Sequence, residues 1–344
     1  MTILDRKGRH SPKRQTTRNT GLPRRWAIAA ICSLSTLVLA PTIAKAQEFP
    51  SKPIHLIVPF APGGITDISA RLLASKLSER LKQSVIVENK AGGNQTIGAE
   101  YVATSPADGH TLIMGTMGSH AVNASLRKDL RFDVKTAFAP ISVVTTQPLI
   151  LVVNPQVATS LEELLSLMKE NPGKYTYGSA GVGTTAHMAA ELFQIQSGVK
   201  LVHIPYKGSG PMLTDLIGGR IDLAFDYAPT ALPQVEGGRL RALAVTSAER
   251  ADFSPKLPAM SEFIPNFAVT AWQGLFAPTN TPASIVDQLS KEVQLVMAMP
   301  EVVANLQAKG AKAGGNDPEE FNRFVQQEIE QWANVVRMNN IQPD

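Results

Sequence analysis

Four short segments of the chain combine glycine with hydroxyl side chains, and each stands where a strand-like run gives way to a helix-like run. They read PFAPGGITD, GTMGSHAVN, YGSAGVGTTAH and PYKGSGPM. The first residues of a helix expose backbone N–H groups without partners and roughly half a positive charge, so such turns attract anions. Glycine also lets a ligand approach the backbone closely. Together the four turns predict a site that binds a small anion.

The donors in these turns are mostly neutral. Hydroxyl donors are added by Thr66, Ser119, Ser179 and Thr184. Lys207 is the only lysine or arginine, whereas a polyphosphate usually meets more positive charge. The pair Gly63-Gly64 also lacks the spacing of the P-loop and of the dinucleotide-binding glycine motif. Any one turn is more simply a tight chain reversal, but four of them favour a ligand, and a small carboxylate fits neutral donors best.

Other chemistry finds little support in the sequence. Asp67 and Asp226 could form an acid–base pair, but capping a helix and accepting backbone N–H groups near a strand end are simpler roles. His120 and His187 follow glycine-rich turns, and His187 at a helix start can merely orient its loop. The chain contains no H-E-x-x-H, cysteine pair or G-x-S-x-G sequence. We therefore expect no metal, no cofactor and no catalytic residues.

The elements that must position these turns alternate along the chain. Strand-like runs such as IHLIVPF, TLIMGT, LILVVN and IDLAFDY are each followed by a turn and a helix-like run. Ser160 and Glu163 are spaced as a capping box, and Asp317 with Glu320 opens a final helix in the same way. One apolar stripe runs along that helix: Phe321, Val325, Ile329, Trp332 and Val336. The alternation predicts an α/β fold with parallel sheets, whose ligands bind beyond the carboxyl ends of the strands.

The first 46 residues have the pattern of a secretory leader. They hold nine basic residues and one acidic residue, an apolar run over 26–40, and the small-x-small sequence Ala44-Lys45-Ala46. A membrane anchor is the alternative, but the apolar run is short for a span and lacks a stop-transfer flank. We expect residues 1–46 to be a signal peptide, cleaved after about Ala46, and the product to be periplasmic. Arg24-Arg25 matches a twin-arginine signal only loosely, so the Sec and Tat routes both stay open.

Removal of this leader reverses the charge of the protein. The 344-residue chain has a formal charge of +4; removing nine of its 33 basic and one of its 29 acidic residues leaves 24 and 28, a net charge of −4. A nucleic-acid-binding surface is therefore not expected. The single cysteine, Cys32, leaves with the leader. The mature chain must then be stabilised by its hydrophobic core alone, which about 300 residues can supply.

Several long blocks resemble a known family, the Bug or TctC-type extracytoplasmic solute receptors of tripartite tricarboxylate transporters. In chain order they are VPFAPGGITDISAR, VENKAGG, HAVNASL followed by FAPIS, YGSAGVGTTAHMAAELF, IPYKGSGPMLTDLIGGRIDLAFD and GGRLRALAVTSAER. The resemblance implies a type II periplasmic-binding fold, with two α/β lobes facing each other across a ligand cleft. Lobe one would comprise 47–146 and 246–344, and lobe two 147–245, with crossings near 144–148 and 245.

The resemblance also implies a function and a site. It implies a monomeric binding protein that captures a di-, tri- or aromatic carboxylic acid for membrane permease subunits. Carried over residue by residue, the implied ligand contacts are Phe60, Pro62, Gly63, Gly64, Thr66, Asp67, Ser119, His120, Ser179, Gly183, Thr184, His187, Tyr206, Lys207 and Asp226. Four positions depart from the pattern of the family and could alter selectivity: Asn94, Gln95, Ala180 and Tyr227.

Two other functions stay open at this point. A receptor that feeds a signalling sensor would use the same fold and the same ligand chemistry, so the sequence does not separate it from a transport receptor. A periplasmic enzyme is disfavoured because no catalytic constellation is visible.

Overall fold

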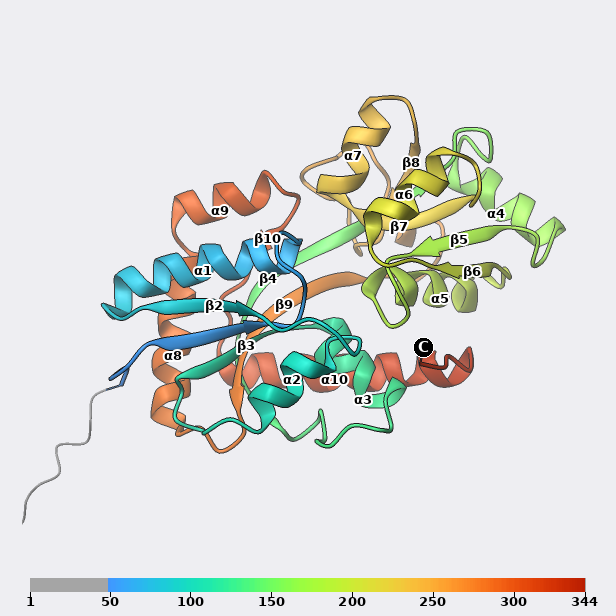
Figure 1. The fold of residues 1–344 in the computed structure, drawn as a ribbon. Coiled ribbons are helices and arrows are strands. Elements are labelled where there is room, and N and C mark those ends of the chain that lie inside the picture. Colours follow the sequence, from blue (N-terminus) through green and yellow to red (C-terminus); the bar gives the residue numbers. More distant parts are fainter. Residues whose placement is uncertain (1–48, 344) are drawn as a thin grey trace, which may run out of the picture. The chain divides into compact units, whose positions relative to one another are not determined.

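The computed structural model describes residues 49–343, so the predicted signal peptide lies outside the described residues. Helices and strands alternate along the chain, as predicted (Figure 1). The first half contains β1 (Ile54–Val58), α1 (Ile65–Leu81), β2 (Val85–Asn89), α2 (Thr96–Ala103), β3 (Thr111–Thr116), the π-helical turn η1 (Gly118–Val122), α3 (Asn123–Leu126), β4 (Phe138–Val153) and α4 (Leu161–Glu170). The second half contains β5 (Thr176–Ser179), α5 (Thr185–Ser197), β6 (Val202–Pro205), α6 (Ser209–Ile217), β7 (Leu223–Tyr227), α7 (Ala228–Glu236), β8 (Arg241–Val245), the short helix η2 (Met260–Glu262), β9 (Thr270–Pro278), α8 (Ala283–Met297), α9 (Pro300–Gln307), β10 (Lys312–Ala313) and α10 (Pro318–Met338).

The strands follow the order β2-β1-β3-β9-β4-β7-β5-β6, with β8 and β10 also paired to β4. The outer strands are parallel: β1 pairs with β2 and β3, and β5 pairs with β6 and β7. The central strands β4 and β9 are antiparallel to their neighbours. The prediction of parallel sheets is therefore confirmed for the outer strands and wrong at the centre, where β4 and β9 run antiparallel to the strands beside them.

Strand β4 connects two groups of elements, which we call lobe one (around β1, β2, β3 and β9) and lobe two (around β5 to β8). Up to Pro148 it pairs with β9, whereas Leu149–Val153 pair with β7 and Ile150–Val153 also pair with β8. In Figure 1 the green β4 and the orange β9 run side by side in lobe one, and β4 continues into lobe two. We propose the predicted division at 147 and 245, and the change of partners along β4 supports the first of these two boundaries.

Local signals fix where the helices begin. The Ser160 hydroxyl accepts a hydrogen bond from the Glu163 N–H at the start of α4, and the Asp317 carboxylate accepts one from the Glu320 N–H at the start of α10. The predicted apolar stripe of α10 is buried along its whole length. Within residues 49–343, no helix combines the length and apolar character that crossing a bilayer requires.

Candidate ligand-binding site

A cavity of about 460 Å³ lies between lobe one and lobe two, within the size range of small-molecule sites. Lobe one contributes Phe60, Gly63, Gly64, Ile65, Thr66, Ile68, Gln95, Thr116 and Gly118. Lobe two contributes Ala180, Thr184, Thr185, Ala186, Gly208, Ser209, Asp226, Tyr227, Pro229 and Thr230. The connecting strand β4 adds Gln147, and β9 of lobe one adds Ala271, Trp272 and Gln273. These lining residues include no lysine, arginine or histidine, and Asp226 is their only carboxylate.

The start of α1 presents free backbone donors to this cavity. Gly64 is the N-cap residue, and within the described chain the N–H groups of Gly64, Ile65 and Thr66 meet no acceptor. The Thr66 hydroxyl accepts a hydrogen bond from Gln273 Nε2 at 3.4 Å, which leaves its own hydrogen available. This helix start can therefore donate several hydrogen bonds to one anion.

Asp67 holds the loop Gly63-Gly64 in place through a hydrogen bond to its backbone. Its Oδ2 accepts hydrogen bonds from the Gly63 N–H and from Arg71 Nε, both at 2.9 Å, and its Oδ1 accepts one from Asn89 Nδ2 at 2.9 Å. Burial acts to raise the pKa of Asp67, but the hydrogen bonds from Arg71, Gly63 and Asn89 outweigh it and lower the pKa to about 2. Gly63 itself has φ +87°, a conformation that L side chains rarely adopt. The Gly63 N–H is thus already used, and Asp67 positions the loop.

Replacing Asp67 with asparagine should lower the free energy of unfolding at pH 7 by about 2 kcal/mol, because charge-assisted hydrogen bonds to a buried group are lost. Folding lowers the pKa of Asp67 from 3.8 to about 2, so its stabilising contribution is complete above about pH 4 and disappears as the pH falls through about 2. The difference between the native protein and the variant should therefore shrink toward pH 2.5 in denaturant titrations. Asp129, an exposed carboxylate that pairs with Arg127, supplies the control Asp129→Asn, for which little change is expected. Equal effects of the two substitutions would contradict the anchoring role of Asp67.

Lobe two presents the start of α5 to the same cavity. The Thr184 hydroxyl accepts a hydrogen bond from the His187 N–H at 3.4 Å and donates one to the Gly181 carbonyl at 2.7 Å. Its hydrogen is therefore already used, contrary to the expectation of a free hydroxyl donor. Within residues 49–343, the N–H groups of Thr185 and Ala186 meet no acceptor, so they are the donors that α5 offers.

His187 orients the loop before α5, as its sequence context suggests. Its Nδ1 accepts a hydrogen bond from the Gly183 N–H at 3.1 Å, and its ring does not line the cavity. The rings of His187 and His203 are stacked with their centroids 4.2 Å apart. The ring of His203 also stacks on that of Tyr177, with a centroid distance of 4.6 Å. Burial, with a smaller contribution from His203, lowers the pKa of His187 to about 3. His187 is therefore neutral and serves as an acceptor for the loop.

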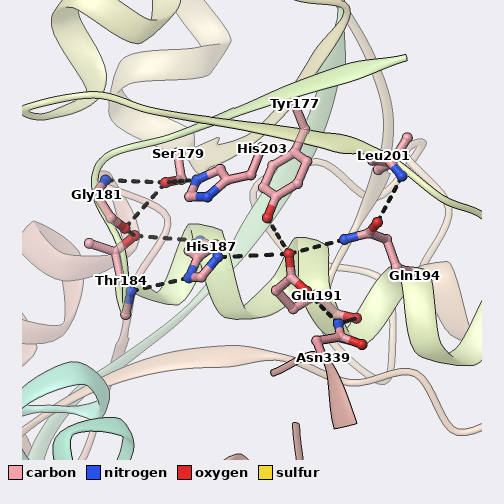
Figure 2. A network of polar contacts seen from close by, with 11 residues as sticks. Tyr177, Ser179, Gly181, Thr184, His187, Glu191, Gln194, Leu201, His203 and Asn339 are labelled. Carbon is pink, nitrogen blue, oxygen red and sulfur yellow. Dashed lines mark hydrogen bonds and ion pairs between the residues drawn. The ribbon is translucent and has the colours of Figure 1, made fainter. Parts of the chain in front are cut away.

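The carboxylate of Glu191, close to this stack, accepts hydrogen bonds from several side chains (Figure 2). Its carboxylate accepts hydrogen bonds from the Tyr177 hydroxyl, from Gln194 Nε2 at 3.0 Å and from Asn339 Nδ2. His187 Nε2 lies 3.7 Å from Glu191 Oε1. Because Asn339 is the C-cap residue of α10, this network connects the helix that opens on the cavity with the end of the last helix.

Asp226 also lines the cavity from lobe two. Its Oδ1 accepts a hydrogen bond from the Ser209 hydroxyl, and its Oδ2 accepts one from the Thr230 hydroxyl, both at 2.7 Å. Ser209 opens α6 and Thr230 lies in the first turn of α7, so this carboxylate stands where two helices begin. The residue is only 1% exposed. Burial raises its pKa, although the hydrogen bonds from Ser209, Thr230 and the Tyr227 N–H act in the opposite direction.

Comparison with known proteins identifies the family. Residues 69–341 match the sequence model of TctC, the tripartite tricarboxylate transporter family receptor. The chain belongs to this family. A relative, BugT of Bordetella pertussis, is 36% identical over 319 residues, which cover 92% of this chain and 97% of BugT.

Solved structures place this TctC-family chain among two-lobed solute-binding proteins. Rpa4515 of R. palustris, solved with adipate, is 38% identical with a TM-score of 0.77, and the match covers 86% of this chain and 100% of Rpa4515. MatC of Rhodopseudomonas palustris, solved with bound malate, is 32% identical with a TM-score of 0.74, over 84% of this chain and 100% of MatC. The predicted family, the two-lobed α/β fold and the role of solute-binding receptor are thereby confirmed.

The cavity of this TctC-family receptor brings together only part of the predicted site. Its lining includes Phe60, Gly63, Gly64, Thr66, Thr184 and Asp226. Outside the lining lie Pro62, Asp67, Ser119, His120, Ser179, Gly183, His187, Tyr206 and Lys207. Ligand binding by the second group stays a prediction that the cavity does not support. In the described chain, no cluster of three or more His, Cys, Asp or Glu side chains is arranged to hold a metal ion.

The partners of these outlying residues explain their positions. Ser119 hydrogen-bonds to His120 Nδ1 at 2.8 Å, and the His120 ring packs against Phe138 and Phe276 at 4.4 and 4.1 Å. Burial lowers the pKa of His120 to about 3, so it is a neutral core residue. The Tyr206 hydroxyl donates to Asp215 at 2.8 Å.

Sequence reasoning missed lining residues of two kinds. Neighbours of the four turns, such as Ile65, Thr185 and Ser209, belong to segments already marked by glycine and could have been included. Gln147 and Gln273 come from β4 and β9, which carry no glycine-rich turn and therefore gave no signal. Of the four departures from the family pattern, Gln95, Ala180 and Tyr227 line the cavity, and Gln95 Oε1 accepts a hydrogen bond from the Thr116 hydroxyl at 2.9 Å.

Proposed function

We propose that this TctC-family receptor is exported by its predicted leader and captures a small carboxylate in the periplasm for the permease subunits of a tripartite transporter. The observation that carries the proposal is a pair of helix starts, those of α1 and α5, whose free N–H groups line one cavity from the two lobes. Adipate and malate in the related receptors Rpa4515 and MatC support an acid as the ligand.

This arrangement couples binding to lobe closure. A carboxylate that accepts hydrogen bonds from Gly64 to Thr66 and from Thr185 and Ala186 favours the arrangement in which the two helix starts face each other. Strand β4, which is shared by both lobes, supplies a connection about which they can move. A single lining carboxylate without a lining histidine offers no acid–base pair, so we propose binding without turnover.

Calorimetric titration of residues 47–344, unfolded and refolded to remove any carried ligand, tests this function. The titrants are mono-, di-, tricarboxylic and aromatic acids, with amino acids and sugars as controls. We expect one class of acid to bind, and Thr66→Val to weaken that binding by about 10- to 100-fold, since a hydrogen bond to a charged group is lost.

Thr136→Val is the matched control, because Thr136 is exposed and lies outside the cavity lining. It should leave the affinity unchanged. Binding of sugars alone, or an affinity for the acid that is equal in both variants, would overturn the proposed carboxylate site.

A further inference from the structure

The strand that connects the two lobes carries a buried polar side chain without a hydrogen-bond partner. Gln147 of β4 is 3% exposed, and within residues 49–343 its side-chain amide neither donates nor accepts a hydrogen bond. Its backbone pairs with Ala271 of β9, so the exception concerns the side chain alone. Buried polar side chains nearly always have a partner, and one that finds none within the protein requires an explanation.

The direction of this side chain follows from the alternation along β4. Thr146 and Pro148, the residues on either side, line a second cavity of about 620 Å³, whereas Gln147 lines the ligand cavity. Successive side chains of a strand point to opposite faces, so the Gln147 amide faces the ligand cavity and its neighbours face away from it. The residue opposite, Ala271, also lines the ligand cavity and has no polar side-chain atom to offer the amide.

A second glutamine in the same cavity shows the ordinary arrangement. Gln273 of β9 is 4% exposed, its Oε1 accepts a hydrogen bond from the Thr145 hydroxyl at 3.2 Å, and its Nε2 donates one to the Thr66 hydroxyl at 3.4 Å. The Gln95 amide likewise has partners within the protein. Of the glutamines that line the cavity, Gln147 is therefore the one whose amide is left entirely to a group inside the cavity.

The chemistry and the place of this amide suit an acid. An amide has two N–H donors and a carbonyl acceptor, so it can bind an oxygen of an acid without adding charge to the cavity. Because β4 pairs with β9 up to Pro148 and with β7 from Leu149, Gln147 stands where the chain passes from lobe one to lobe two. The free N–H groups of α1 and α5 line the same cavity. The cavity thus offers donors from both lobes and from the strand that connects them.

We propose that Gln147 is a ligand-binding residue, whose side-chain Nε2 donates a hydrogen bond to an oxygen of the captured acid. This inference rests on the proposed function and adds a contact at the connection between the lobes. The contact belongs to none of the four glycine-rich turns from which the site was predicted. Because the fold itself does not use this amide, its removal should weaken binding without weakening the fold.

Gln147→Met tests the proposal, because methionine has a similar size and shape but no amide. The measurement is calorimetric titration of refolded residues 47–344 with hexanoate, adipate, malate, citrate and benzoate. For the acid that the native protein binds most tightly, we expect the affinity of the variant to fall by about tenfold or more, since a hydrogen bond to a charged group is lost. Gln326→Met, an exposed substitution on α10 outside the cavity lining, should leave the affinity unchanged.

Thermal unfolding without added acid separates a ligand contact from a structural role. Replacing an unpaired buried amide by an apolar group of the same shape is neutral or stabilising, so Gln147→Met should not lower the melting temperature. Gln273→Met removes an amide that has two partners, and should lower the melting temperature by about 2 °C.

The outcomes separate this inference from the proposed function. An unchanged affinity in folded Gln147→Met would overturn the inference and leave carboxylate capture intact. A fall in melting temperature as large as that of Gln273→Met would also overturn it, and so would failure of Gln147→Met to fold, because the fold would then depend on the amide. If the native protein binds none of the acids, the proposed function fails and this inference fails with it.

Discussion

Replacing Gly274 with alanine is expected to lower the free energy of unfolding by about 3 kcal/mol. Gly274 lies within β9, where a Cβ atom would overlap Cζ of Phe321 and lie 2.8 Å from Cε1 of the same ring. The Phe321 ring is fully buried and packs against Phe276 at 4.9 Å and Trp272 at 5.9 Å, so it cannot move aside without displacing other rings. The lower backbone entropy of alanine in the unfolded chain offsets at most about 1 kcal/mol of this loss.

Guanidinium chloride titration measures this effect, and Gly210→Ala is its control. Gly210 lies in α6, has no positive φ, and leaves open space within 4 Å of the point where a Cβ atom would stand. Alanine there should be neutral or should stabilise by up to about 1 kcal/mol. The two substitutions are thus expected to differ clearly, with a large loss only at Gly274. If Gly274→Ala leaves the free energy of unfolding unchanged, the Phe321 ring of α10 does not pack as closely on β9 as these distances state.

Replacing Glu191 with alanine is expected to destabilise the protein by a similar amount, about 3 kcal/mol. Glu191 is 8% exposed and receives hydrogen bonds from Tyr177, Gln194 and Asn339. Its removal leaves a fully buried tyrosine hydroxyl without that acceptor and opens a cavity beside it. Thermal and urea unfolding, compared with the exposed substitution Glu330→Ala on α10, measure the loss.

A second variant tests the stated cause. If the orphaned hydroxyl is responsible, Tyr177→Phe should cost less in the Glu191→Ala background than in the native protein, because it removes a donor that has lost its acceptor. Strictly additive effects of Glu191→Ala and Tyr177→Phe would show that the two groups do not act together.

Features that depend on short-range signals were predictable from the sequence. The capping residues Ser160 and Asp317, and the apolar stripe of α10, follow from spacing within a few residues. The loop before α1 was also predictable, because its glycines, its hydroxyl group and the following helix are contiguous, and it does line the cavity. The family blocks then extended these local predictions to the two-lobed fold.

Features that depend on tertiary partners were not predictable from residue type. Four hydroxyl residues were expected to donate to a ligand, but Ser179 hydrogen-bonds to His203 and Thr184 donates to Gly181, whereas Thr66 keeps its hydrogen. The turn GTMGSHAVN looks like the others in sequence, yet it places His120 between Phe138 and Phe276 in the core. All four turns contribute lining residues, but only the packing of distant segments decides which side chains of each turn reach the cavity.

The position of β9 has a consequence for the order in which the protein can be completed. Strands β3 and β4 appear early in the chain, but β9 lies between them in the sheet, with Thr116 opposite Gln273 and Thr146 opposite Trp272. During synthesis from the N-terminus, the edges of β3 and β4 that face β9 therefore remain open until lobe two has been made. The sheet of lobe one, which begins the chain, is therefore completed last. A chain that ends before Thr270 would lack β9 and leave the edges of β3 and β4 unpaired.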